Sequence, residues 1–161
     1  MLKDKKYKGF SLIEILIVVG LILILAAVTI VAINPAKHFR DTRDSERSAD
    51  VGELLNAVTQ YTAEEGNLLS QLGEVPACLE NPTDPEDYGT EIGKATGNID
   101  LAGDTSTDKL VEEYIVEIPV DPSEGDEDGD NTGYYICETA GGRVQISAPH
   151  TEEADPIVVR R

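Results

Sequence analysis

An uninterrupted apolar segment near the N-terminus constrains this chain more than any other feature. Residues 10–33 are apolar, and only Ser11, Glu14, Gly20 and Thr29 break the run. A helix of about 20 apolar residues spans the hydrocarbon core of a bilayer, so this segment is long enough to cross a membrane. A cleaved secretory signal is the alternative, but its apolar region is shorter, about 7–15 residues. The segment therefore predicts a transmembrane helix.

Charged side chains are divided unequally between the two sides of this segment. Residues 1–9 contain four Lys and one Asp, whereas residues 51–161 contain 25 acidic and five basic side chains. Lys and Arg tend to stay in the cytoplasm, so we expect a single membrane pass with the N-terminus on the cytoplasmic side. The formal net charge of the chain is −18, and such a charge repels phosphate backbones. We therefore expect no nucleic acid to bind the acidic part.

Glu14 is the only charged residue inside the apolar segment. A charged side chain at the centre of a spanning helix costs about 2.5–3.5 kcal/mol on insertion scales, and such residues usually face a partner. One interpretation is that Glu14, one turn inside the membrane edge, extends toward the lipid headgroups. The other is that it meets a cation in the membrane. The residues around it favour the second interpretation.

Residues 8–14 read Lys-Gly-Phe-Ser-Leu-Ile-Glu and run into the apolar segment. This pattern resembles the prepilin signature of type IV pilins and type II secretion pseudopilins. That family has a short basic leader ending in Gly, then Phe, with Glu as the fifth residue of the mature chain. The resemblance implies that a prepilin peptidase of the inner membrane cuts between Gly9 and Phe10. It also implies that the new amine of Phe10 is methylated.

Physical chemistry gives each of these three residues a role. Gly9 has no side chain, so the backbone there enters a narrow protease cleft in an extended form. Cleavage leaves a positive amine on Phe10, which must lie beside hydrocarbon. The carboxylate of Glu14 on a neighbouring subunit neutralises it, because a paired buried charge is tolerated where an isolated one is not. We therefore expect Glu14 to direct assembly and the uncut leader to block it.

The helical pattern continues beyond the membrane. Asn34-Pro35 predicts a kink rather than an end, because Pro removes one backbone donor and clashes one turn back. Residues 37–47 alternate in charge, which favours a solvated or inter-subunit surface. An apolar stripe at helical spacing follows and comprises Val51, Leu54, Leu55, Val58, Tyr61 and Thr62. Gly66 then supplies a stop. We expect one helix from about residue 10 to residue 65.

The rest of the chain, residues 66–161, is expected to form a globular head. Residues 66–109 are rich in Gly, Pro, Asn and Asp and predict a long loop with a short helix. Residues 110–118, 134–138 and 143–148 have the β-branched and aromatic content of strands, with a shorter edge strand at 157–159. Gly141-Gly142 predicts a hairpin turn. An antiparallel sheet on the helix stripe gives an α+β, pilin-like fold.

Four segments follow from this reading. They are a leader (1–9), a transmembrane and assembly helix (10–33), its amphipathic continuation (34–65) and the head (66–161). The only two cysteines, Cys78 and Cys137, both lie in the head. In an oxidising compartment we expect them to form a disulfide. Two buried free thiols are the alternative.

Residues 121–130 contain six acids. The carboxylates of Asp121, Asp126, Asp128 and Asp130 are the kind of hard oxygen ligand that calcium prefers. The spacing excludes an EF-hand, because Asn131 and Cys137 stand where that loop needs Gly and Glu. Some major secretion pseudopilins hold calcium in a similar loop, and Ile-Pro-Val-Asp-Pro at 118–122 resembles theirs. Calcium is thus one hypothesis and a solvated acidic turn is the other.

Three classes of function remain open. The first is a structural subunit of a type IV pilus-like filament, the second a pseudopilin that drives protein export, and the third a membrane-anchored domain that does not polymerise. We do not expect an enzyme, because the sequence has no nucleophile elbow, phosphate loop or metal-binding helix motif.

The resemblance also implies partners and a location. The partners are copies of the same chain in a helical filament, a prepilin peptidase, an inner-membrane assembly platform and minor pilins. We expect the chain first in the bacterial inner membrane, then in a cell-surface or periplasmic filament. We expect no cofactor, unless the calcium hypothesis is right.

Overall fold

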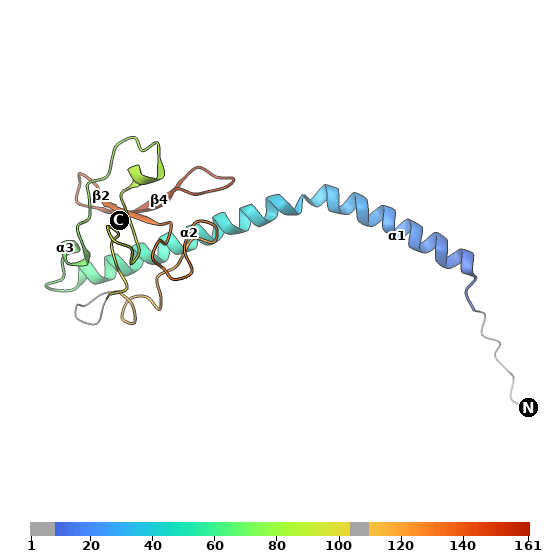
Figure 1. Cartoon of the computed structure of the whole chain (residues 1–161), viewed down its shortest axis with the longest axis horizontal. Coiled ribbons are helices and arrows are strands. Elements are labelled where there is room, and N and C mark those ends of the chain that lie inside the picture. The colour runs from blue at the N-terminus through green and yellow to red at the C-terminus, as the bar shows by residue number, and fades with distance from the viewer. Residues whose placement is uncertain (1–8, 104–109) are drawn as a thin grey trace, which may run out of the picture. The chain divides into compact units, whose positions relative to one another are not determined.

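The computed structural model describes residues 9–103 and 110–161, so residues 1–8 of the expected leader and residues 104–109 lie outside the described chain. The chain divides into two compact units, one up to Phe39 and the other Arg40–Arg161. Two long helices come first in the chain, then a short helix, a 3-10 turn and the strands of one sheet (Figure 1). We describe the two units separately.

Helix α1 (Leu12–Ile33) forms most of the first unit. Ser11 lies at its N-cap in an extended conformation, and its hydroxyl accepts a hydrogen bond from the backbone N–H of Glu14 at 3.3 Å. Ser is favoured there because it satisfies one of the backbone donors that a helix start leaves free. The helix ends at Asn34, whose φ of 48° is left-handed, and Asn tolerates this conformation better than most residues.

Helix α2 (Pro35–Ala63) begins directly after Asn34. Pro is tolerated at the first position of a helix because its missing N–H has no helical partner there. The long N-terminal helix predicted from the sequence is confirmed from Leu12 to Ala63. The kink predicted at Asn34-Pro35 is a one-residue break between the two helices.

The second unit contains an antiparallel sheet that completes the predicted α+β fold. Its strands lie in the order β1 (Thr90–Glu91), β2 (Tyr135–Glu138), β3 (Val144–Ala148) and β4 (Ile157–Arg160). Strand β3 pairs with β2 and β4, while β1 and β4 form the two edges. Gly142, with φ of 73°, donates its backbone N–H to Thr139 in the turn between β2 and β3. The predicted hairpin is therefore confirmed.

The hydrophobic core joins α2 to this sheet. The apolar stripe of α2 is buried against residues such as Ile136 of β2 and Ile146 of β3. Five of the six residues predicted for the stripe are buried, together with Ala57, whereas Thr62 is half-buried; the five are Val51, Leu54, Leu55, Val58 and Tyr61. Burial of such a stripe is what stabilises an amphipathic helix in a folded domain. The stripe predicted from the sequence is therefore the face that α2 buries.

The strand predicted at residues 110–118 is wrong. This segment forms turns, in which the backbone N–H groups of Tyr114 and Ile115 donate to the carbonyl of Leu110. Leu110 and Ile115 are nevertheless buried in the core. The apolar pattern therefore predicted which residues are buried, but not that they pair as a strand. The sequence also gave no signal for β1, which has only two residues. The expected short helix in the loop is α3 (Leu69–Leu72), and a 3-10 turn, η1 (Pro85–Tyr88), follows.

A disulfide joins Cys78 to Cys137 of β2. Backbone hydrogen bonds support the same junction. The N–H of Cys78 donates to the carbonyl of Glu138, and the N–H of Glu138 donates to the carbonyl of Pro76, both at 2.8 Å. The loop before β1 is thus fixed to the sheet at this point by covalent and hydrogen bonds together.

Candidate functional site

Gly9 and Phe10 precede α1 and are exposed. A Cβ atom built on Gly9 meets no atom of the described residues within 4 Å, so packing against this part of the chain does not require Gly at position 9. The exposed fraction of Phe10 is 78%. The described part of the chain therefore leaves the peptide bond between Gly9 and Phe10 uncovered.

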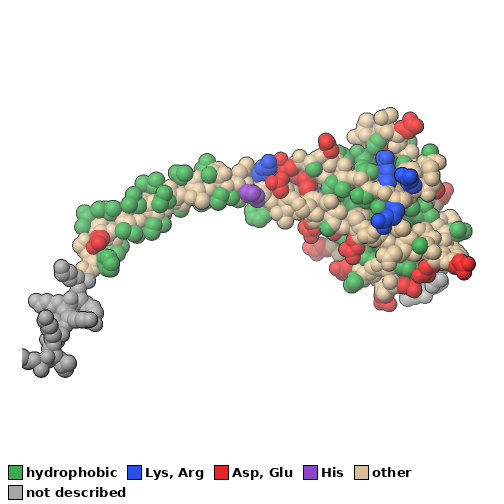
Figure 2. All heavy atoms as spheres, turned by 180° about the vertical axis from the view of Figure 1, so that it is seen from behind, with side chains coloured by type: hydrophobic (Ala, Val, Ile, Leu, Met, Phe, Trp, Pro, Cys, Tyr) green, Lys and Arg blue, Asp and Glu red, His purple; other side chains and the backbone are tan. Residues whose placement is uncertain are grey.

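Glu14 lies in the first turn of α1, where a carboxylate is favoured by the helix dipole. Its side chain is exposed, and within the described residues no cation forms an ion pair with it. In Figure 2, acidic atoms lie among hydrophobic side chains near the start of the apolar helix. The carboxylate is thus available to a group from outside this chain.

The surface of α1 is apolar on all sides. None of its residues is buried in this chain, and the exposed fractions of its large apolar side chains range from 47% for Val18 to 88% for Leu12. A helix that is hydrophobic all round is normally covered by lipid or by other protein. Length and composition make it able to cross a membrane. The helix therefore needs a bilayer, neighbouring helices or both.

A buried ionic cluster lies in the second unit, on α2. The guanidinium of Arg47 is fully buried and binds Asp121 through Nε at 2.6 Å and Nη2 at 2.9 Å. Its Nη1 donates to Asp44 at 2.8 Å, and Nη2 also donates to the hydroxyl of Ser123. The hydrogen bond to Asp121 is the main reason why the pKa of Arg47 is raised. Arg47 thus links α2 to the turn before β2.

Asp44 has a second role as a cap for the backbone near residue 152. Its carboxylate accepts hydrogen bonds from the N–H groups of Glu152, Glu153 and Ala154 at 2.9–3.3 Å. Burial alone would raise the pKa of Asp44, but these bonds and that of Arg47 outweigh it and hold the pKa below its ordinary value. The cluster therefore fixes two distant turns on one helix.

The solvated or inter-subunit surface predicted for residues 37–47 is only partly right. Arg40 and Arg43 form partly exposed ion pairs with Glu153 and Glu152, whereas Arg47 is buried. The spacing already contained a signal, because Arg47 precedes Val51 by four residues and so continues the apolar stripe of α2. Sequence reasoning missed this because a buried Arg needs a partner that is distant in the chain, here Asp121.

The four acids of the calcium hypothesis do not form one site. The carboxylate of Asp121 is buried and is bound by Arg47 and by the N–H groups of Ser123 and Glu124, so it does not fit a calcium ligand. Asp126, Asp128 and Asp130 are exposed, and a side-chain oxygen of Asp126 accepts from Asn131 at 2.7 Å. Across the described residues, no three acidic, His or Cys side chains are grouped to hold a metal ion. Calcium binding by the three exposed acids stays a prediction.

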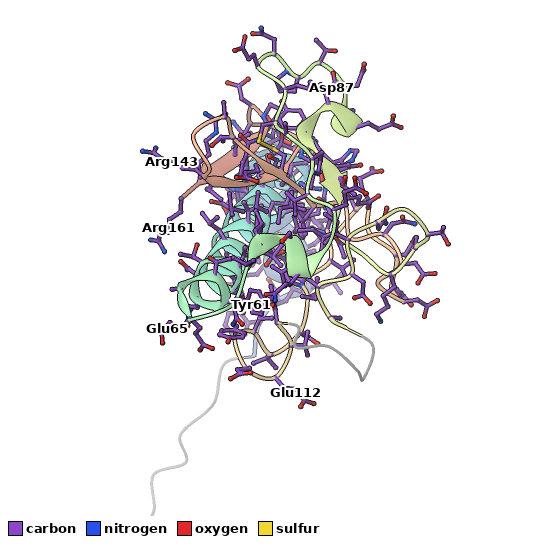
Figure 3. All side chains as sticks on the ribbon, turned by 90° about the vertical axis from the view of Figure 1, so that its left-hand side faces the viewer. Tyr61, Glu65, Asp87, Glu112, Arg143 and Arg161 are labelled. Atoms are coloured by element: carbon purple, nitrogen blue, oxygen red, sulfur yellow. A yellow bond between two sulfur atoms is a disulfide. The ribbon has the colours of Figure 1, made fainter. Side chains whose placement is uncertain are left out.

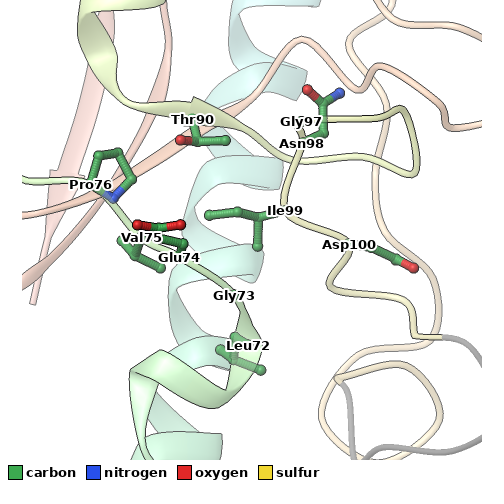
Figure 4. Close-up of a pocket in the computed structure, with 10 residues that line it drawn as sticks. All are labelled: Leu72, Gly73, Glu74, Val75, Pro76, Thr90, Gly97, Asn98, Ile99 and Asp100. Carbon is green, nitrogen blue, oxygen red and sulfur yellow. The ribbon is translucent and has the colours of Figure 1, made fainter.

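A groove of about 580 Å³ lies beside α3 (Figure 4). Glu74 and Asp100 are its only charged lining residues. Asp100 already accepts the backbone N–H groups of Ala102 and Gly103 at 3.0 Å. The other polar side chains of the lining are those of Thr90 and Asn98.

Comparison with known proteins identifies the N-terminal segment. Residues 4–30 match the family model described as the prokaryotic N-terminal methylation motif, which is the prepilin-type leader of type IV pilins and pseudopilins. No curated protein and no solved structure matches the chain. The motif indicates a precursor of a type IV pilin-like protein or pseudopilin. It points to a structural protein and implies processing by a prepilin peptidase and filament assembly in general.

Proposed function

We propose that this chain is a structural subunit of a type IV pilus-like filament that polymerises through α1 after removal of residues 1–9. One observation carries the proposal: α1 is apolar and has no buried residue, and its one acid, Glu14, is the fifth residue after Gly9, as in the prepilin signature. Such a surface is unstable in water unless other apolar groups cover it. Packed copies of the same helix in a filament supply that cover outside the bilayer.

Cleavage gives this assembly a switch. The amine on Phe10 appears only when the peptide bond after Gly9 is cut, and it is positive at neutral pH. Glu14 of a neighbouring subunit then accepts this charge, and the pair is tolerated in apolar surroundings. A subunit displaced along the helix axis by one turn leaves two charges unpaired. The pair therefore sets both the timing and the register of assembly.

The proposal includes the partners and locations that such assembly needs. The precursor enters the inner membrane with α1 and meets the prepilin peptidase there. An assembly platform and minor pilins then add it to a filament at the cell surface or in the periplasm. Calcium bound by Asp126, Asp128 and Asp130 is a separate proposal and is not needed for these steps.

A pseudopilin of a type II secretion system is the second candidate. Residues 118–122 followed by an acidic turn resemble the calcium loop of major pseudopilins, whereas the pair Cys78–Cys137 is more typical of pilins. Neighbouring genes separate the two functions. A secretin with several minor pseudopilins indicates secretion, and a retraction motor indicates a pilus. Electron microscopy of sheared cells distinguishes long pili from short pseudopili.

The test of the proposed function is Glu14→Ala in the full-length chain. Membrane insertion becomes easier by about 2.5–3.5 kcal/mol, and cleavage survives because the scissile bond is untouched. Mass spectrometry of both proteins is expected to find a mature chain that begins at Phe10 with one added methyl group. The variant is expected to form no filaments, because the amine then has no carboxylate to meet.

Thr29→Ala is the matched control, because Thr29 also lies in α1 and only donates to the carbonyl of Leu25 within the helix. We expect it to form normal filaments. Normal filaments from Glu14→Ala would mean that this carboxylate only extends to the headgroups. Loss of cleavage in Glu14→Ala would assign the carboxylate to the peptidase instead.

A further inference from the structure

Three arginines gather at one edge of the acidic head, and we call Arg143, Arg160 and Arg161 the arginine edge. They are three of the five Lys and Arg in residues 51–161. Arg143 precedes β3, and Arg161 follows β4 and exchanges both backbone hydrogen bonds with Val144 at 3.0 Å. All three are exposed. Figure 3 shows Arg143 and Arg161 next to each other on one side of the head.

The arginine edge is not neutralised within the chain. Arg160 donates to the amide oxygen of Gln145 at 2.6 Å and Arg161 to that of Asn56 at 2.9 Å, so both partners are neutral. By contrast, Arg40, Arg43 and Arg47 each bind a carboxylate. Among the described residues, no ion pair involves the arginine edge. These contacts orient the guanidinium groups without cancelling their charge.

The strongest concentration of negative charge lies beyond the opposite ends of the same strands. We call residues 124–130 the acidic turn, and its exposed acids are Glu124, Asp126, Glu127, Asp128 and Asp130. The backbone of this turn pairs with the segment that follows β1. The N–H of Lys94 donates to the carbonyl of Gly129, and the N–H of Ala95 donates to that of Asp130. The acidic turn precedes the start of β2, whereas the arginine edge lies where β2 ends, β3 begins and β4 ends. The two charged surfaces therefore lie at opposite ends of these strands.

We propose that the arginine edge of one subunit binds the acidic turn of a second copy of this chain. Two complementary surfaces at opposite ends of the strands make a heterologous contact, which generates an open helical array where the rotation between copies does not close into a ring. Charge complementarity of this kind sets register and specificity more than raw affinity. The inference rests on the proposed filament function, to which it adds a contact between heads.

A second copy suits this surface better than other anionic partners. Residues 51–161 carry 25 acids, so the head as a whole repels nucleic acid and anionic lipid. A copy of the same chain presents its cationic edge and its acidic turn in a fixed relation. Copies held by their helices in one membrane or filament also meet at a high effective concentration. Surface ion pairs that are weak one by one then act together.

The test is a photo-crosslink in the full-length chain, in membranes and without calcium. p-Benzoylphenylalanine replaces Ala140, which is exposed near Arg143 at the tip of the β2–β3 hairpin. This leaves all three arginines in place. We expect a crosslinked dimer in which mass spectrometry maps the bond to residues 121–133 of the second copy. The yield is expected to fall in 1 M salt, where the Debye length is only about 3 Å.

Charge reversal gives the decisive comparison. Arg143→Glu, Arg160→Glu and Arg161→Glu together are expected to lower the dimer yield about tenfold or more, because several ion pairs become repulsive at once. Glu124→Lys, Glu127→Lys and Asp128→Lys together are expected to do the same. The structure gives these three carboxylates no hydrogen bond to any described residue, so the fold is retained. Combining both sets restores the dimer.

The matched control reverses three exposed acids elsewhere on the head, Glu74→Lys, Glu80→Lys and Glu86→Lys. It changes the net charge as much as the turn variant and is expected to leave the yield unchanged. The contact is wrong if the dimer maps to another segment, if the crosslink captures a different protein or a lipid, or if the control falls equally.

The experiment also separates the contact from the filament function. Filaments without the mapped dimer would reject the head contact alone. The mapped dimer without filaments would support the contact and reject the filament function. Absence of both would reject both.

Discussion

Arg47 shows how one residue connects elements that are far apart in the chain. Its guanidinium has no exposed surface and binds Asp44 on the same helix and Asp121 in the turn 74 residues later. A buried ion pair adds little net stability compared with apolar residues of the same shape. Removing one partner, however, leaves an uncompensated charge that costs about 3–5 kcal/mol. The cluster therefore selects one arrangement of α2 and the turn and adds little to the net free energy of unfolding.

Asp121→Asn tests this cluster at the scale of the residue. We expect the free energy of unfolding at pH 7 to fall by about 3–5 kcal/mol, because Arg47 loses its main charged partner. Urea unfolding of the full chain in detergent micelles, followed by tyrosine circular dichroism, measures the change. Asp155→Asn is the matched control at an exposed position, and we expect it to change stability by less than about 0.5 kcal/mol.

The same variant has a defined pH dependence. Burial raises the pKa of Asp121, but the hydrogen bonds from Arg47, Ser123 and Glu124 dominate and lower it below the ordinary 3.8. A lowered folded-state pKa stabilises the protein above pH 3.8, and this stability is lost as the pH falls through the folded value. Asp121→Asn is therefore expected to lose less stability on acidification than the parent chain. If the free energy of unfolding fell equally with pH in both proteins, Asp121 would not be the source of this pH dependence.

At the scale of the element, the disulfide holds the loop before β1 on β2. The residues Cys78 and Cys137 are separated by 59 positions. The chain-entropy model gives about 4 kcal/mol for closing a loop of this length. We expect Cys78→Ser with Cys137→Ser to lower the free energy of unfolding by about this amount. Reduction of the parent chain is expected to slow its migration in electrophoresis, and two thiols labelled without reductant would contradict the bond.

The acidic turn is the second element with a direct test. Calcium binding would now rest on Asp126, Asp128 and Asp130, because Asp121 is held by Arg47. The prediction from the sequence is that millimolar calcium raises the melting temperature, since a ligand of the native state stabilises it by mass action. Asp128→Asn with Asp130→Asn is expected to abolish the rise, and magnesium serves as the control ion. An unchanged melting curve would leave a solvated turn.

At the scale of the whole molecule, the distribution of charge predicts the orientation in the membrane. Four Lys precede the apolar segment and 25 acids follow residue 50. We expect alkaline phosphatase to be active when it is fused after Arg161 and inactive when it is fused after Gly9, because the enzyme requires export. Replacement of Lys3, Lys5, Lys6 and Lys8 by Glu is expected to lower the activity of the first fusion. An inactive fusion after Arg161 would contradict the predicted orientation and would place the C-terminus in the cytoplasm.

The sequence by itself determined the features that depend on local pattern. The apolar segment, the methylation motif, the break at Asn34-Pro35 and the stripe of α2 each follow from residues close together in the chain. Strands β2 and β3 were also predictable, because their apolar content and the Gly141-Gly142 turn lie within one hairpin. In these places the local preference and the tertiary packing favour the same conformation.

Only the tertiary structure decided the features that depend on distant partners. Residues 110–118 are apolar enough for a strand, yet they form turns. Leu110 and Ile115 are buried in the core, and backbone hydrogen bonds within the segment close the turns, so no neighbouring strand is needed. Arg47 is buried because Asp121 reaches it from the turn before β2, and the same contact removes Asp121 from the calcium hypothesis. The arginine edge exists because β3 and β4 pair in a register that brings Arg161 next to Val144. Secondary-structure propensity depends on residues that are close together in the chain, whereas these contacts join residues that only folding brings together.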